Sequence, residues 1–98
     1  MKEPFYITTS IPYVNGEPHL GHAMEFIQAD VLARYARLQD MDVVYSTGSD
    51  EHGSKVAETA LKLGITPKEL ADQNSQRFRE LMSKLNVTSD RFIRTTDK

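Results

Sequence analysis

The sequence predicts an α/β fold in which a parallel sheet is flanked by helices. Two short runs rich in aromatic and β-branched residues, 5–9 and 42–47, enclose a long amphipathic segment at 20–39. A strand, a helix and a second strand in this order form a βαβ unit, whose crossover is nearly always right-handed. Ligands of open parallel sheets bind beyond the carboxyl ends of the strands, so the loops after the two runs are the first places to look for a site.

Composition limits what the chain can do. Its 98 residues hold one domain at most, and 12 Lys and Arg against 14 Asp and Glu give no overall basic field that would attract nucleic acid. With no cysteine, the chain forms neither a disulfide framework nor a thiolate metal site. No long apolar run follows the opening Met-Lys-Glu-Pro, so we expect no signal peptide, no membrane span and a cytoplasmic location.

The first strand is predicted over 5–9, where Phe-Tyr-Ile-Thr-Thr is a pattern typical of a buried strand. Asn-Gly and Glu-Pro dipeptides then keep residues 10–18 in an ordered loop. The helix over 20–39 carries apolar residues at spacings of three and four: Leu20, Met24, Ile27, Val31, Tyr35 and Leu38. Asp30 and Arg34 form an i,i+4 pair on its polar side, and Phe26, Ala29, Ala33 and Ala36 widen the apolar arc, which predicts cover on two sides.

The second strand, 42–47, leads into a polar loop at 48–53 and a second helix at 54–63. We expect that helix to bury Val56, Ala57, Ala60 and Leu61 and to end at a left-handed Gly64. Thr-Pro-Lys-Glu at 66–69 is a capping box that starts a third helix, which ends near Lys84. Its apolar stripe is Leu70, Phe78, Leu81, Met82 and Leu85, and a further strand is predicted at 91–94.

Topology brings the loops 10–18 and 48–53 to the same edge of the sheet, although about thirty residues separate them. His19, His22, Asp50, Glu51 and His52 are therefore expected to face one pocket. Tyr13 and Tyr45 fit either the core or that pocket, whereas Met24 and Met82 are expected in the core.

His19 and His22 lie three residues apart at the start of the long helix, so both imidazoles lie beside its unpaired backbone N–H groups. A phosphate would be bound there by the histidines, the N–H groups and the helix dipole, and Gly21 would let a purine or ribose approach the backbone. Alternatively the two histidines are surface residues or helix caps. The pattern alone does not choose between these readings.

Asp50, Glu51 and His52 are adjacent, and adjacent loop residues rarely all point at one ion, so no metal site is expected here. Asp50 alone could receive a cationic group of a small substrate. The alternative is an Asx turn that caps the helix beginning at Ser54.

Three motifs in order resemble one family. The string Thr-Thr-Ser-Ile-Pro-Tyr-Val-Asn-Gly-Glu-Pro-His-Leu-Gly-His at 8–22 is similar to the signature of the class I aminoacyl-tRNA synthetases, whose His-Ile-Gly-His motif appears as His19-Leu20-Gly21-His22. The methionyl members resemble it further in Pro-Tyr-Val-Asn-Gly, in Ala-Asp-Val-Leu-Ala-Arg-Tyr at 29–35 and in Thr-Gly-Ser-Asp-Glu-His-Gly at 47–53. The resemblance runs from about Tyr6 to the end of the chain.

The resemblance implies that residues 1–98 are the first half of a Rossmann-like nucleotide-binding fold of the class I synthetase (HUP) type, within the catalytic domain. It also implies activation of methionine with ATP and Mg²⁺ to methionyl-adenylate, and transfer of the methionyl group to tRNA(Met). By position, His19 and His22 would hold the ATP phosphates as the catalytic residues, Gly21 would lie beneath the adenine, and Asn15 would shape the phosphate side. Methionine would be lined by Ser10, Ile11, Tyr13 and Asp50, with Asp50 on its amino group and Tyr13 over its side chain.

Parts of the family pattern do not occur in these residues. The Lys-Met-Ser-Lys-Ser-type loop, the second half of the nucleotide fold, the anticodon-binding domain and the inserted domain that often holds zinc through cysteines have no counterpart in the sequence. We therefore expect an N-terminal fragment that binds no zinc and is inactive alone, with tRNA contacts mostly elsewhere. The alternatives are another class I synthetase for an apolar amino acid, or a nucleotide-binding module without catalysis.

Overall fold

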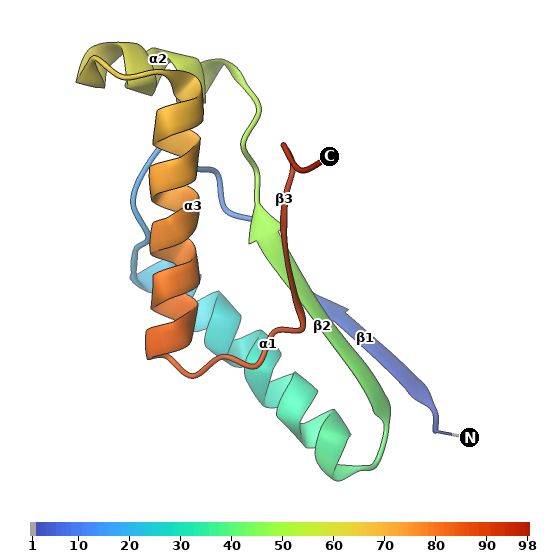
Figure 1. Ribbon diagram of the computed structural model, residues 1–98. Coiled ribbons are helices and arrows are strands. Elements are labelled where there is room, and N and C mark those ends of the chain that lie inside the picture. Colours follow the sequence, from blue (N-terminus) through green and yellow to red (C-terminus); the bar gives the residue numbers. More distant parts are fainter. Residues whose placement is uncertain (1) are drawn as a thin grey trace.

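A three-stranded parallel sheet in the order β1-β2-β3 forms one layer of the protein, and the helices form the other (Figure 1). The computed structural model describes residues 2–98. Its dimensions of 51 × 28 × 16 Å fit two layers. The elements are β1 (Pro4–Thr8), α1 (Leu20–Leu38), β2 (Asp42–Ser49), α2 (Ser54–Leu63), α3 (Pro67–Lys84) and β3 (Arg91–Arg94).

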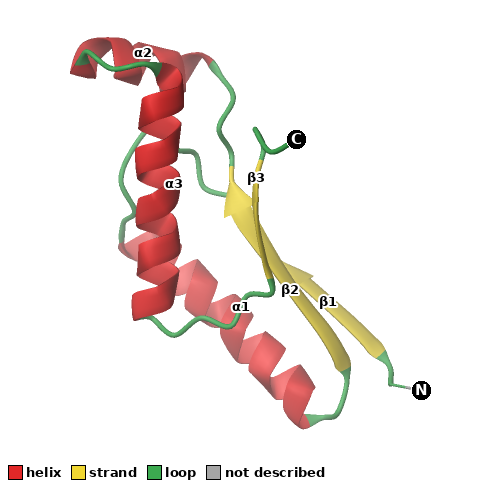
Figure 2. Cartoon of the chain, viewed as in Figure 1, coloured by secondary structure: helices red, strands yellow, loops and turns green. Residues whose placement is uncertain are grey.

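The predicted α/β fold class is confirmed. β1 pairs with β2 from Pro4 opposite Asp42 to Thr8 opposite Ser46, and β2 pairs with β3 from Ser46 opposite Arg91. Both long helices, α1 and α3, lie on the same face of the sheet (Figure 2), and the loops predicted to carry the site both follow the carboxyl ends of strands. No helix within residues 2–98 has the length and apolar character that crossing a membrane requires.

β2 is longer than predicted. It continues through Gly48 and Ser49, which the sequence placed in the polar loop. Gly48 pairs with Ile93 of β3, and a Cβ atom built on Gly48 would lie 1.9 Å from the Ile93 carbonyl oxygen. The glycine is therefore needed for the close approach of the two backbones rather than for a turn.

Gly48→Ala is expected to destabilise the fold by about 1–3 kcal/mol or more, because β3 must move away from β2 to admit the methyl group. Gly16→Ala is the matched control, since a Cβ there meets no atom within 4 Å. Denaturant unfolding of both variants measures the difference. Equal stabilities would show that β3 moves aside without loss of packing.

The helix limits agree closely with the sequence. α2 begins and ends as predicted, with Gly64 in the left-handed conformation at φ 73°. At α3, the Thr66 hydroxyl accepts the Glu69 backbone N–H at 3.1 Å, and Pro67 occupies the first turn. These limits were predictable because each depends on residues within one turn of the helix end.

The face that α1 buries is not the one its largest side chains predict. The apolar positions Leu20, Met24, Ile27, Val31, Tyr35 and Leu38 are all exposed, between 42% and 86%. The buried face is made mostly of small residues: Ala23, Phe26, Ala29, Asp30, Ala33 and Ala36. Alanines on this face let the helix backbone lie close to the sheet. Met24, being exposed, is not a core residue.

Asp30 corrects the expectation of a polar-side pair. Its ion pair with Arg34 is present at 2.7 Å, but the carboxylate is buried and also accepts the Thr88 backbone N–H at 2.8 Å. Burial would raise the pKa of Asp30, but the hydrogen bonds from Thr88 and Arg34 outweigh it and lower the pKa. The hydrogen bond from Thr88 to Asp30 joins α1 to the segment that leads into β3.

Tyr45 belongs to the core. It is fully buried against Ala29 and Ala33, its hydroxyl donates to the Phe26 carbonyl at 3.0 Å, and burial raises its pKa to about 12. Met82 is also buried, with Phe26 and Phe78. A third cluster joins Val14, Val56, Ala60, Leu70 and Ala71, whereas Ala57 and Leu61 of α2 are exposed, contrary to expectation.

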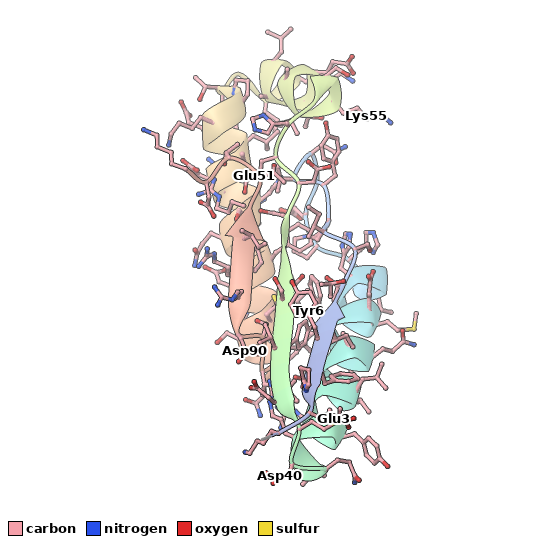
Figure 3. All side chains as sticks on the ribbon, turned by 90° about the vertical axis from the view of Figure 1, so that its right-hand side faces the viewer. Glu3, Tyr6, Asp40, Glu51, Lys55 and Asp90 are labelled. Atoms are coloured by element: carbon pink, nitrogen blue, oxygen red, sulfur yellow. The ribbon has the colours of Figure 1, made fainter. Side chains whose placement is uncertain are left out.

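The opposite face of the sheet carries exposed side chains. Tyr6 of β1 is 66% exposed, so β1 is not the buried strand that its composition suggested. Figure 3 views this face directly, with Tyr6 in front of the sheet and the helices behind.

Candidate functional site

The two predicted loops meet where β1 and β2 end. Asp50 donates its backbone N–H to the Pro12 carbonyl at 2.8 Å, and its own carbonyl accepts the Val14 N–H at 3.2 Å. Tyr13 and Asp50 thereby form a parallel bridge that lengthens the β1–β2 ladder beyond the strands themselves. The expectation that topology joins these distant loops is confirmed.

Tyr13 connects the loops through its side chain as well. A Cβ atom on Gly53 would lie 1.7 Å from the Tyr13 hydroxyl, so the phenol ring occupies the space that a side chain at Gly53 would need. Gly53 also has φ 135°, a conformation open to glycine but strained for other residues. Tyr13 is therefore half-buried between the two loops.

His19 and His22 cap helix α1 reciprocally. His19 Nδ1 accepts the Gly21 N–H at 3.1 Å, and His22 Nδ1 accepts the His19 N–H at 3.1 Å. The rings stack with centroids 3.7 Å apart, and a Cβ on Gly21 would lie 2.9 Å from His19 Cε1. The reading of the histidines as helix caps is thus confirmed, and Gly21 makes room for the His19 ring.

Capping assigns the proton of each neutral imidazole. Because both Nδ1 atoms accept hydrogen bonds, the proton of each neutral ring lies on Nε2, which can donate to a further group. The N–H groups of Gly21 and His22 bond to His19 instead of remaining unpaired, contrary to expectation. An anion at this helix end would therefore be bound by two imidazole Nε2–H groups, with less backbone help than predicted.

The environment of His22 favours its neutral form. Burial and the neighbouring His19 lower the pKa of His22 below 6.5, against a smaller opposing effect of Glu25. Phe78 of α3 lies edge-on to the ring at 4.9 Å. The cap is therefore intact at neutral pH, because a protonated Nδ1 could not accept the His19 N–H.

Glu25 is a residue that the sequence did not single out. Its carboxylate accepts the Ser10 backbone N–H and hydroxyl, both at 2.7 Å, and so ties the first loop to α1. Nothing in the local sequence pairs these residues, because fifteen positions and a loop separate them. Ile11, next to Ser10, is 41% exposed.

Glu51 and His52 line a cavity that neither Asp50 nor His19 and His22 line, so the expectation that all five face one pocket is wrong for these two residues. The Glu51 carboxylate is buried and receives Arg94 Nε at 2.7 Å, Arg94 Nη2 at 2.8 Å and the hydroxyls of Ser49 and Thr96. The residue lies at the end of β2 beside β3 (Figure 3). Because all its acceptors are engaged, Glu51 anchors the loop and is not available to a ligand.

The geometry of residues 50–53 also decides the place of His52 and the alternative of a helix cap by Asp50. His52 lies with Glu51, Lys68 and Arg94 along a cavity of about 420 Å³ on the α3 side. The residue capping α2 is Gly53, without a side-chain hydrogen bond, so the alternative of an Asx cap by Asp50 is wrong. Within residues 2–98, no group of three or more histidine and carboxylate side chains gathers closely enough to hold a metal ion.

Glu51→Gln is expected to lower the free energy of unfolding by about 3 kcal/mol, because Arg94 loses its bidentate carboxylate partner. Burial would raise the pKa of Glu51, but hydrogen bonds from Arg94, Ser49 and Thr96 outweigh it and lower the pKa. The stabilisation that the ionised Glu51 carboxylate contributes is therefore complete above its unfolded pKa of 4.5. It is lost as the pH falls through the lower pKa that Glu51 has in the folded chain.

Unfolding curves between pH 3 and 7 measure this effect, with Glu58→Gln on the exposed face of α2 as control. If the wild-type chain and the Glu51→Gln variant lose stability equally on acidification, Glu51 is not the group responsible.

Comparison with known proteins identifies the family. The family described as "tRNA synthetases class I (M)" matches residues 5–98. The chain belongs to the class I tRNA synthetases. A methionine–tRNA ligase of Brucella suis is 52% identical over 97 residues, which are 99% of this synthetase chain, and one of Rhizobium meliloti is 53% identical over 95 residues, which are 97% of it.

A solved structure agrees with this assignment. The Mycobacterium tuberculosis methionyl-tRNA synthetase in complex with methionyl-adenylate superposes with a TM-score of 0.95 at 49% identity, over 97% of this synthetase chain. The predicted resemblance to the methionyl members is confirmed. The chain spans 19% of that structure's chain and 19% and 18% of the two ligases, so most of their length lies outside the match.

Proposed function

We propose that the full-length protein carrying this chain is a methionine–tRNA ligase. It would activate methionine with ATP, with Mg²⁺ as the counter-ion of the phosphates, and transfer the methionyl group to tRNA(Met). The observation that carries the proposal is the likeness to a synthetase solved with methionyl-adenylate, combined with the joined loops at Tyr13 and Asp50. Residues 1–98 would supply the first part of its Rossmann-like catalytic domain.

The loop ending at Tyr13 and the residue Asp50 form the methionine wall in this proposal. Asp50 is half-buried beside Tyr13, and among residues 2–98 no side chain or backbone group bonds to its carboxylate, whereas Glu51 is committed to Arg94. Asp50 would receive the substrate ammonium, with Tyr13 over the side chain. Ser10, fixed by Glu25, and the Ile11 backbone would complete this wall.

The ATP wall runs from Asn15 to His22. The two imidazole Nε2–H groups would donate to the phosphates, Gly21 would lie beneath the adenine, and Asn15 would shape the phosphate side. Attack of the methionine carboxylate on the α-phosphorus forms the adenylate and expels pyrophosphate, and needs no protein nucleophile. Catalysis is then a matter of alignment and of donors aimed at the charge that develops on the phosphate oxygens.

Amino-acid-dependent exchange of pyrophosphate into ATP by the full-length protein tests the proposal. We expect exchange with methionine and much less with leucine, isoleucine or valine. Preference for one of these would instead favour another class I synthetase, and ATP binding without exchange would favour a nucleotide-binding module. The 98-residue chain by itself is expected to be inactive in the same assay, because it spans 19% of the solved synthetase and the remaining parts of the pocket would lie outside it.

A further inference from the structure

Asn74 stands at a position of α3 where the helix pattern calls for an apolar residue. It lies four residues after Leu70 and four before Phe78, both buried, and its own exposure is 2%. A buried carboxamide destabilises a fold unless it is fully hydrogen-bonded. Asn74 can therefore be buried among apolar neighbours only because other groups hydrogen-bond its carboxamide.

The partner of Asn74 is the loop between the two proposed walls. Its Nδ2 donates to the Val14 carbonyl at 2.6 Å, and its Oδ1 accepts Arg77 Nη1 at 3.0 Å. Arg77 in turn pairs with Glu17 of the same loop at 2.9 Å, although both of those side chains are largely exposed. The buried contact to Val14 is thus the stronger of the two attachments to the loop.

Val14 connects Asn74 with Asp50. The Val14 N–H donates to the Asp50 carbonyl, while its own carbonyl accepts from Asn74, and the Val14 side chain is completely buried. The peptide units on either side of Val14 are therefore held between the end of β2 and the middle of α3. Residues 10–13 precede this point and residues 15–22 follow it.

We propose that Asn74 is a positioning residue that sets both walls of the site through the Val14 carbonyl. It touches neither substrate. Losing its Nδ2–H donor frees the loop on both sides of Val14. Tyr13 and Asp50 then lose their pairing register, and Asn15 and the histidines lose their fixed positions. The substrate roles in this inference rest on the proposed function, whereas the anchoring of the loop does not.

Two substitutions of Asn74 remove the Nδ2–H donor. Asn74→Asp keeps the size of the side chain, but a carboxylate facing the Val14 carbonyl can prevent folding, so Asn74→Ser is the second variant. The adjoining cavity of about 430 Å³, lined by Asn15, Asn74 and Arg77 among others, lets water reach the shortened side chain. Gln76→Ala, exposed on the same helix, is the matched surface control.

Ala36→Gly controls for loss of stability alone. Ala36 is buried near the end of α1 that lies away from both loops, and glycine in a helix interior is destabilising. We expect Ala36→Gly to lower the melting temperature without changing the KM for methionine or the KM for ATP.

Asn74→Ser in the full-length protein is expected to raise the KM for methionine and for ATP and to lower kcat/KM by about tenfold or more.

Hydrogen exchange measured without substrates tests the anchoring independently. Amides of residues 13–17 and 50–53 should exchange faster in Asn74→Ser than in Ala36→Gly, with no difference between the two in β3. Unchanged exchange in these segments overturns the inference, as does a rise in only one KM or in neither. If the wild-type protein shows no methionine-dependent exchange of pyrophosphate, the proposed function fails, while the amide measurement still decides whether Asn74 anchors the loop.

Discussion

Replacing Asp50 by asparagine is expected to lower kcat/KM for methionine in the full-length protein by about 30-fold or more, since losing one partner of a desolvated charge pair costs about 2–5 kcal/mol. Asparagine keeps the shape of the side chain and leaves the backbone bonds from Asp50 to Pro12 and Val14 in place. The change therefore removes the negative charge and little else. The KM for ATP should remain close to the wild-type value.

Asp42→Asn is the control for Asp50→Asn. Asp42 is exposed and begins β2, whereas Asp50 follows its last residue, so this variant tests a change of net charge on β2 away from the loops. Pyrophosphate exchange at varied methionine concentrations gives both constants. If Asp50→Asn keeps a normal KM for methionine and a normal kcat, the substrate ammonium binds elsewhere.

Replacing His19 by asparagine should reduce kcat for adenylate formation by about 10²–10³-fold, which is typical for the loss of one preorganised donor. Asparagine is a good N-cap, because its Oδ1 can accept the Gly21 N–H as His19 Nδ1 does. It has no counterpart to the Nε2–H of His19. The substitution therefore separates the cap from the proposed phosphate donor.

Two further variants complete this experiment. His19→Ala removes both the cap and the donor, so it should lose activity and also about 1 kcal/mol of stability. His52→Asn is the control histidine, on the cavity beside α3. A His19→Asn variant with unchanged kcat and unchanged KM for ATP would mean that His19 serves the helix alone.

The sequence predicted what depends on neighbours within a few residues. The limits of α2 and α3 are fixed by Gly64, Thr66 and Pro67, and each acts within one turn. The meeting of the two loops, which Tyr13 and Asp50 make, followed from the parallel order of β1 and β2, whose carboxyl ends lie at one edge of the sheet.

Other features depend on distant partners and could not be predicted in this way. The position of Glu51 in the loop predicts a pocket residue, and its true partner Arg94 cannot be found from local sequence because it lies forty-three positions away. The sequence does not choose between cap and anion site for the histidines, because each ring has two nitrogens and only coordinates show that the cap uses Nδ1. Asn74 did carry a signal, as a polar residue in an apolar stripe, but not the identity of its partner.

The bridge between Tyr13 and Asp50 also has a thermodynamic consequence. The same short stretch of backbone would be ordered by methionine on one side and by ATP on the other, so the entropy lost when one substrate binds is not lost again for the second. Binding of the two substrates should then be positively coupled. Because linkage is reciprocal, methionine should tighten ATP by the same factor by which ATP tightens methionine.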